Sequence, residues 1–162
     1  MALMTPRPTA SQLTAAPWME WAYLALGEHR IPGPQHNPIV VDFLRYVGAA
    51  SNGDETPWCS AFANWCMEQA GIRGTRTALA RSWLLWGDFT LARPTFGCVT
   101  VLWRTSPASM HGHVGFYVGQ DGNRLLLLGG NQTTQSKVTI GTYLRSRVLG
   151  YRWPPGRALM QA

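Results

Sequence analysis

Three polar residues, far apart in the chain, have the types that a thiol acyl-transfer enzyme uses. Cys59 lies where a proline-containing turn leads into a segment with helical apolar periodicity. His113 opens a predicted strand, and Asn131 follows a Gly-Gly pair further along. In such enzymes the cysteine attacks an acyl carbon, the histidine moves the proton and a polar third residue orients the histidine. A thiol at a helix N-terminus also feels the positive end of the helix macrodipole, which favours the thiolate.

Position distinguishes Cys59 from the other two cysteines. Cys66 falls in the middle of the same predicted helix and Cys98 inside a predicted strand, which is typical of core thiols. Along a helix the Cα atoms of Cys59 and Cys66 lie about 10 Å apart, beyond the roughly 7 Å that a disulfide tolerates. An odd number of cysteines also argues against a disulfide scaffold, so we expect free thiols.

Two histidines compete for the role of general base. His113 opens a strand, and small Gly115 on the same face leaves room for a substrate, whereas His111 belongs to the preceding loop. A base acts best from a rigid element, which favours His113. The His-x-His spacing also suits two metal ligands, but no CxxC or HExxH pattern completes such a site. We predict no metal and no cofactor.

The register of the predicted hairpin decides whether the third residue can orient His113. A three-residue loop at 121–123 places His113 opposite Asn131, whereas a two-residue turn directs Asn131 to the other face of the sheet. A bulge at the preceding Gly-Gly pair can compensate in the second case. Asn131 is the predicted third residue and Gln132 is the reserve. The alternative is that Asn131 is a loop amide that binds only backbone groups.

Four further residues are candidates for contacts with a substrate. Trp58, Trp83 and Tyr117 could wall a groove, although aromatic residues at such positions are as often part of the core. Arg81 is a candidate partner for a substrate carboxylate, because a guanidinium binds carboxylates through two parallel hydrogen bonds.

Apolar periodicity changes from helical to strand-like about halfway along the chain. Helices are expected at 17–29, 37–48, 57–70 and 78–86, and strands at 98–103, 113–118, 124–128, 138–140 and 149–153. Helices followed by an antiparallel meander predict an α+β domain, with N-terminal helices packed on an antiparallel sheet. We place this domain at residues 17–154, between a flexible arm at 1–16 and a C-terminal tail at 155–162.

Charge is unevenly distributed over the 162 residues. Residues 1–92 carry six Arg and seven acidic residues, for a net charge of −1, whereas residues 93–162 carry seven Arg, one Lys and one acid, for +7. This basic half favours a polyanionic partner or merely a soluble surface. Nucleic acid is disfavoured because the arginines are scattered and no reading motif is present. No apolar run reaches about 18 residues, which excludes a membrane-spanning segment.

Several blocks of sequence together resemble the CHAP family, the cysteine, histidine-dependent amidohydrolases/peptidases, a branch of the papain-like, NlpC-type wall hydrolases. The blocks are IPGPQHNP (31–38), TPWCSAF (56–62), ALARSW (78–83), GHVGFYVG (112–119), LGGNQ (128–132) and LGYRWP (149–154). The resemblance implies a papain-like fold and cleavage of peptidoglycan amide bonds. It also implies that Cys59 is the nucleophile, His113 the base and Asn131 the polar third residue.

Two features depart from the family pattern. The acidic calcium loop that some CHAP endolysins carry before the cysteine is not evident, because Asp54-Glu55 is too small a cluster. Where relatives usually have Gly-Asp at the start of the first strand, this chain has Gly97-Cys98, which removes any role for an acid there.

The resemblance leaves the biological setting open. Segment 1–16 lacks the basic start and apolar core of a signal peptide, so we expect synthesis in the cytoplasm and action in the periplasm or at the wall of a target bacterium. A phage endolysin and an injected toxin with an immunity protein both fit, and the protein is expected to be a monomer. The alternatives are another thiol acyltransferase or protease acting on protein, or a non-catalytic wall-binding module.

Overall fold

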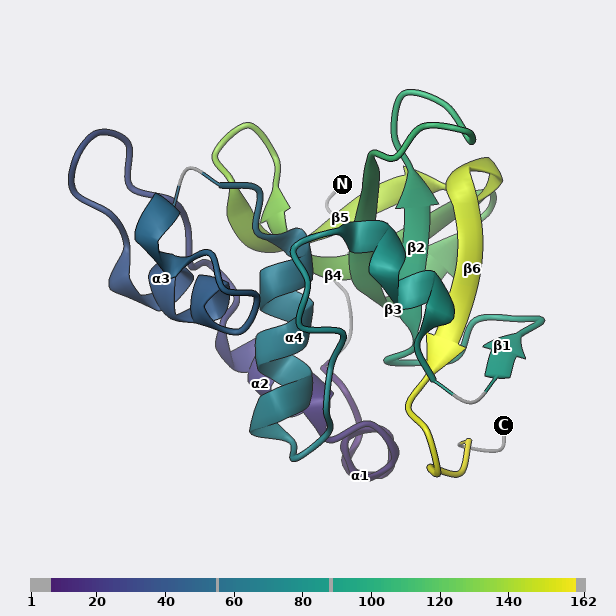
Figure 1. The fold of residues 1–162 in the computed structure, drawn as a ribbon. Helices are drawn as coiled ribbons and strands as arrows, with labels where there is room; N and C mark the ends of the chain where they lie inside the picture. The colour runs from purple at the N-terminus through teal and green to yellow at the C-terminus, as the bar shows by residue number, and fades with distance from the viewer. Residues whose placement is uncertain (1–6, 55, 88, 160–162) are drawn as a thin grey trace.

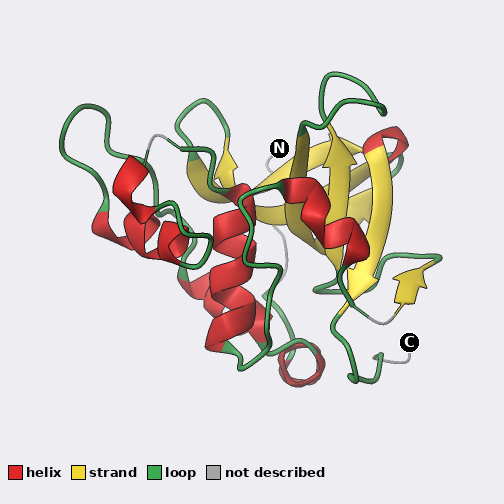
Figure 2. Cartoon of the chain, in the orientation of Figure 1, coloured by secondary structure: helices red, strands yellow, loops and turns green. Residues whose placement is uncertain are grey.

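An antiparallel sheet formed by the second half of the chain is the centre of the fold (Figures 1 and 2). The computed structural model describes residues 7–54, 56–87 and 89–159. Within these residues the sheet has six strands in the order β1-β6-β2-β3-β4-β5. Their bounds are Phe89–Leu91 (β1), Val99–Trp103 (β2), Gly112–Asp121 (β3), Arg124–Gln132 (β4), Lys137–Leu144 (β5) and Val148–Trp153 (β6).

Helix α4 is the element that joins the helices to the sheet. It contacts β3 and β4 on one side and α2 and α3 on the other (Figure 1). The helices are α1 (Ala10–Ala15), α2 (Trp18–Leu24), α3 (Pro38–Arg45) and α4 (Cys59–Gln69), with short 3₁₀ helices η1 (Ala50–Asn52), η2 (Ala80–Leu85) and η3 (Arg145–Arg147). Helices packed on an antiparallel sheet confirm the predicted α+β class.

The core lies on both sides of α4. Phe62 of this helix packs against Phe116 of β3, with ring centroids 6.3 Å apart, and against Phe43 of α3 at 5.3 Å. Burying one such ring contributes roughly 1.5–3 kcal/mol to stability. Cys66 and Met67 are also fully buried, in agreement with the prediction that Cys66 is a core thiol.

The N-terminal arm predicted at 1–16 is corrected in part. Residues 10–15 form α1, because the Thr9 hydroxyl accepts from the backbone of Gln12 while the Gln12 side chain accepts from the backbone of Thr9. Ala16 is fully buried. In the C-terminal tail, Arg157 lies over the ring of Trp18 at 5.9 Å. Residues 1–6 and 160–162 of the predicted arm and tail lie outside the described residues.

The helix predicted at 17–29 ends early because the chain pairs with the sheet instead. After α2 ends at Leu24, Gly27 donates to the carbonyl of Val138, and Val138 donates to that of Glu28. This segment thereby extends the sheet beyond β5, next to the turn that leads out of β4. Strands β4 and β5 are both longer than predicted, and β1 was not predicted at all.

The β3–β4 hairpin has a turn that neither prediction gave, but beyond a shift within β3 it has the pairing predicted for the three-residue loop, with Phe116 opposite Leu128. Asp121 pairs with Arg124, so the connection is a two-residue turn at 122–123, one residue later than expected for a two-residue turn. The register then shifts between Tyr117 and Gly119, and the pairing of β4 with β5 shifts between Gly129 and Gln132. These irregularities decide which side chains at the end of β4 face His113.

Candidate active site

Cys59 is the first residue of α4. The first hydrogen bond of this helix runs from the N–H of Phe62 to the carbonyl of Trp58 at 2.9 Å, so the N–H groups before Phe62 have no partner within the helix. Gly130 of β4 lets the helix approach closely, because a Cβ there would lie 2.7 Å from atoms of both Phe62 and Trp58. The Cys59 side chain is 6% exposed and lines a cleft.

The imidazole of His113 on β3 lies close enough to the Cys59 thiol to lower its pKa. Burial raises the pKa of this thiol, but the neighbouring His113, together with the N–H groups of Val114 and Ser60, lowers it more. The net result is a Cys59 pKa below its ordinary value. The structure therefore places a thiol that ionises readily beside an imidazole that can carry its proton.

Gln132 holds the other side of the imidazole. Its Oε1 lies 2.8 Å from His113 Nε2, while its Nε2 donates to the carbonyls of Leu127 and Thr139 and to the Thr139 hydroxyl, at 3.3, 2.9 and 3.1 Å. Because three acceptors surround the amide nitrogen, the oxygen must be the atom that faces the ring. His113 Nε2 therefore carries a proton, which leaves Nδ1 for Cys59.

Asn131 does not make the contact predicted for it. It has a φ of 56°, a left-handed conformation that Asn tolerates, and its position coincides with the irregularity in β4. The half-buried Asn131 still lines the same cleft as His113, but the 3% exposed Gln132 is the residue that is turned inward onto the ring. The reserve candidate therefore takes the position beside His113. An irregularity at the Gly-Gly pair was considered in the sequence analysis, whereas the shift between Tyr117 and Gly119 was not predicted.

Tyr143 of β5 is a site residue that the sequence analysis missed. Its ring stacks on that of His113 with centroids 5.2 Å apart and planes at 27°, and its hydroxyl lies 3.3 Å from His113 Nε2. Burial raises the pKa of Tyr143, as does the negative charge of Cys59, so the hydroxyl stays protonated. The predicted strand stopped at residue 140, short of this tyrosine.

Two clefts open on either side of the Cys–His pair. The cysteine cleft has a volume of about 420 Å³ and is lined by Pro57, Cys59, Ala78, Leu79, Ala80, Arg104, Thr105, Met110, His111 and Gly112. The histidine cleft has a volume of about 400 Å³ and is lined by Leu102, Trp103, Arg104, His113, Asn131, Gln132, Thr133, Thr134, Tyr143 and Arg147. Arg104 is common to both. His111, the competing base, is an exposed residue of the cysteine cleft.

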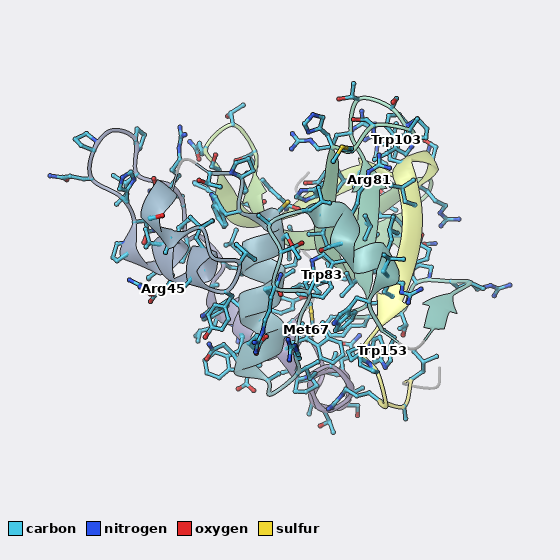
Figure 3. The ribbon with its side chains drawn as sticks, viewed as in Figure 1. Arg45, Met67, Arg81, Trp83, Trp103 and Trp153 are labelled. Atoms are coloured by element: carbon cyan, nitrogen blue, oxygen red, sulfur yellow. The ribbon has the colours of Figure 1, made fainter. Side chains whose placement is uncertain are left out.

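Arg81 serves a purpose other than the predicted contact with a carboxylate. Its guanidinium donates to the carbonyls of Ser106, Pro107 and His111, at distances between 2.9 and 3.2 Å. These carbonyls belong to the loop that leads into β3 and His113. Figure 3 shows Arg81 near Trp103, which is the last residue of β2 before that loop. Arg81 therefore fixes a loop at the rim of the cysteine cleft.

The aromatic residues predicted to wall a groove lie elsewhere. Trp58 and Trp83 are fully buried, and Trp83 donates from its indole N–H to the Ser60 hydroxyl at 3.0 Å, so neither ring reaches a cleft. Figure 3 shows Trp83 and Met67 in the layer between α4 and the sheet. Tyr117 lines a different groove, near Arg145 and Tyr151. Trp58 and Trp83 were misassigned because the sequence pattern does not separate cleft aromatics from core aromatics.

The Asp54 carboxylate, in the acidic segment before Cys59, is satisfied by hydrogen bonds within the protein. Asp54 is fully buried, and its carboxylate accepts from the backbone of Ile31 and Asn37, both at 2.8 Å, and contacts the His36 ring at 2.9 Å. Glu55 lies outside the described residues. In the described part of the chain, no group of three or more His, Cys, Asp or Glu residues could hold a metal ion.

Comparisons with known proteins find similarity in structure but none in sequence. No protein family model matches the chain, and no curated protein does. Among solved structures, the chain is similar to a Staphylococcus aureus subsp. aureus Mu50 protein described as similar to a lipoprotein of the NLP/P60 family. The two are 14% identical with a TM-score of 0.48, over 94% of this chain and 44% of that chain. The function is therefore argued from the residues of the site.

Proposed function

We propose that the protein is a cysteine amide hydrolase that cleaves an amide bond in the peptide stem of bacterial peptidoglycan. The observation that carries the chemistry is His113, which lies beside the Cys59 thiol and hydrogen bonds to Gln132, at the junction of two clefts. The choice of peptidoglycan comes from the sequence blocks that resemble the CHAP family. The basic second half of the chain supports an anionic polymer as the partner.

The proposed reaction has two steps. The Cys59 thiolate attacks the carbonyl carbon of the amide, and the N–H of Cys59, which lacks a partner within α4, stabilises the oxyanion. His113 gives its proton to the nitrogen as the C–N bond breaks, so that an amine leaves and a thioester remains. Water, losing a proton to His113, then hydrolyses the thioester to a carboxylic acid and restores the thiol.

Digestion of purified sacculi tests this proposal, with mass spectrometry of the released fragments to identify the bond that is cut. We expect release by the wild-type protein and by the Cys66→Ala variant, and none by Cys59→Ala. Casein serves as the competing substrate. Cleavage of casein but not of sacculi would support a protease instead, and inertness of Cys59 towards iodoacetamide near neutral pH would support a non-catalytic binding module.

The proposed site of action is the periplasm or the cell wall of a target bacterium. None of the described helices has the length and apolar character needed to cross a membrane. Delivery as a phage endolysin and delivery as a secreted toxin are both compatible with the proposed activity. Co-purification with a small exported protein encoded next to it would support the toxin, because a toxin of this kind requires an immunity protein.

A further inference from the structure

Two arginines line the clefts at the Cys–His pair. Arg104 belongs to both clefts, and Arg147 belongs to the histidine cleft. The guanidinium of Arg147 lies 5.0 Å from the centroid of the Trp103 ring, which restricts its orientation. Burial raises the pKa of Tyr143, and the positive charge of Arg104 partly offsets this, which places Arg104 within electrostatic reach of the ring stacked on His113.

Neither positive charge is neutralised by the protein. Among the described residues that line the two clefts, none is an Asp or a Glu. Within the described part of the chain, neither guanidinium forms an ion pair or a side-chain hydrogen bond. Arg81, by contrast, directs its donors at loop carbonyls. Two unpaired guanidinium groups with free donors beside a nucleophile suit an anionic substrate, above all a carboxylate.

The two clefts also differ in which reacting group they contain. Cys59 lines only the cysteine cleft, and His113 lines only the histidine cleft. In the proposed reaction the acyl half of the substrate becomes attached to Cys59, whereas the leaving amine receives its proton from His113. The leaving half therefore lies in the histidine cleft, where Arg104 and Arg147 both reach it.

We infer that the enzyme selects amide bonds whose amine-side residue carries a free carboxylate, which Arg104 and Arg147 bind in the histidine cleft. This inference rests on the proposed function, because it names the class of stem peptide that the site accepts. The two arginines are specificity residues in this scheme. They hold the leaving half so that its nitrogen lies against His113.

Matched synthetic stem peptides test the inference. One peptide carries a free carboxylate on the residue that supplies the scissile amine, a second carries a carboxamide there, and a third has its carboxamide on the acyl half instead. For the wild-type protein, we expect amidation on the amine side to lower kcat/KM about 10- to 100-fold, the usual effect of losing a hydrogen bond to a charged group. Amidation on the acyl side should change it less than about threefold.

Variants assign the preference to the two residues. Arg104→Gln and Arg147→Gln should lower kcat/KM for the free carboxylate by about 10- to 100-fold and leave the amine-side carboxamide peptide nearly unchanged. Arg124→Gln is the matched control, because Arg124 is exposed at the start of β4 and lines neither cleft. Equal cleavage of all three peptides by the wild type, or a preference that survives both substitutions, would overturn the inference.

Binding to the Cys59→Ala variant separates this inference from the proposed function. If the wild type cleaves none of the peptides, the proposed hydrolysis is wrong, but titration calorimetry with Cys59→Ala still decides on carboxylate recognition. Tighter binding of the free carboxylate, lost when Arg104→Gln is added, supports recognition in a module without catalysis. Equal affinity for the carboxylate and amine-side carboxamide peptides contradicts it.

Discussion

Two cysteines of one helix have opposite properties. Cys59 at the start of α4 and Cys66 two turns later are both buried, with 6% and 0% of their surface exposed. Burial raises the pKa of both thiols, and for Cys66 nothing of similar size opposes it, so its pKa lies well above the ordinary value. At Cys59 the neighbouring His113 and the N–H groups of Val114 and Ser60 together outweigh burial, and the pKa falls.

This difference teaches that neither burial nor membership of α4 makes a thiol reactive here. Cys98 in the sheet is a second buried core thiol, and burial raises its pKa to about 12. A reactive cysteine needs a neighbouring group that stabilises the thiolate, and Cys59, at the start of α4, lies beside His113. The same side chain is therefore a nucleophile at the start of α4 and a core residue two turns later.

Removal of the histidine should abolish the difference between the two thiols and give the largest effect. We expect His113→Ala to reduce hydrolysis of sacculi by at least about 10⁴-fold, as for loss of a general base that acts as a unit with its nucleophile. His111→Ala is the control, and it should retain activity within about threefold because its side chain is exposed on the cleft rim. A His113→Ala protein with wild-type turnover would contradict the assignment.

The pH dependence of alkylation measures the same difference directly. A lowered pKa means that Cys59 is ionised below the pH at which an ordinary cysteine ionises, so the midpoint of its iodoacetamide profile should lie below about 8.5. In His113→Ala the imidazole no longer opposes the effect of burial on the Cys59 pKa, so the midpoint of the iodoacetamide profile should move above that value. Cys66 and Cys98 should react only in the unfolded protein. Mass spectrometry of the labelled peptides identifies each site, and labelling of Cys66 in the folded protein would refute the contrast.

Substitution of Gln132, the residue that orients His113, should have a smaller effect on activity, and the neighbouring Asn131 provides a control. Gln132→Ala should lower kcat/KM about 10- to 100-fold, because it removes the group that orients the ring, as for other residues that position a functional histidine. Its neighbour Asn131→Ala should cost less than about threefold. A positioning role also predicts that the alkylation midpoint of Cys59 rises in Gln132→Ala only. If Asn131→Ala lowered kcat/KM more than Gln132→Ala, Asn131 would be the third residue, as predicted from the sequence.

The sequence identified those parts of the site that depend on local signals. The turn before Cys59 and the change in periodicity at His113 are both visible in short windows, which is why these two residues were found. The choice between Asn131 and Gln132 depends on a hairpin turn displaced by one residue and on one irregularity in each of β3 and β4. No local pattern fixed either of these, because a one-residue slip reverses which face each side chain occupies.

Burial and tertiary partners account for the other differences. Trp58 and Trp83 share their composition and spacing with cleft aromatics, and only the packing of α4 on the sheet shows that they are in the core. Arg81 was predicted to bind a substrate carboxylate, but its guanidinium donates to the carbonyls of the loop before β3. Arg104 reaches both clefts from just beyond β2, a placement that follows from the order of the strands rather than from any motif.

Tyr143 should give the smallest effect, since it adds to an activation that His113 and Gln132 already provide. Tyr143→Phe keeps the stacked ring and removes a hydroxyl at 3.3 Å, a long hydrogen bond, so we expect kcat/KM to fall only about two- to fivefold. Tyr143→Ala should fall further, because His113 then loses the ring that packs against it. Tyr117→Phe, in a different groove, is the control and should be silent. If Tyr143→Phe were as damaging as Gln132→Ala, the hydroxyl would itself take part in the proton transfer, and the nitrogen that faces Cys59 would have to be assigned again.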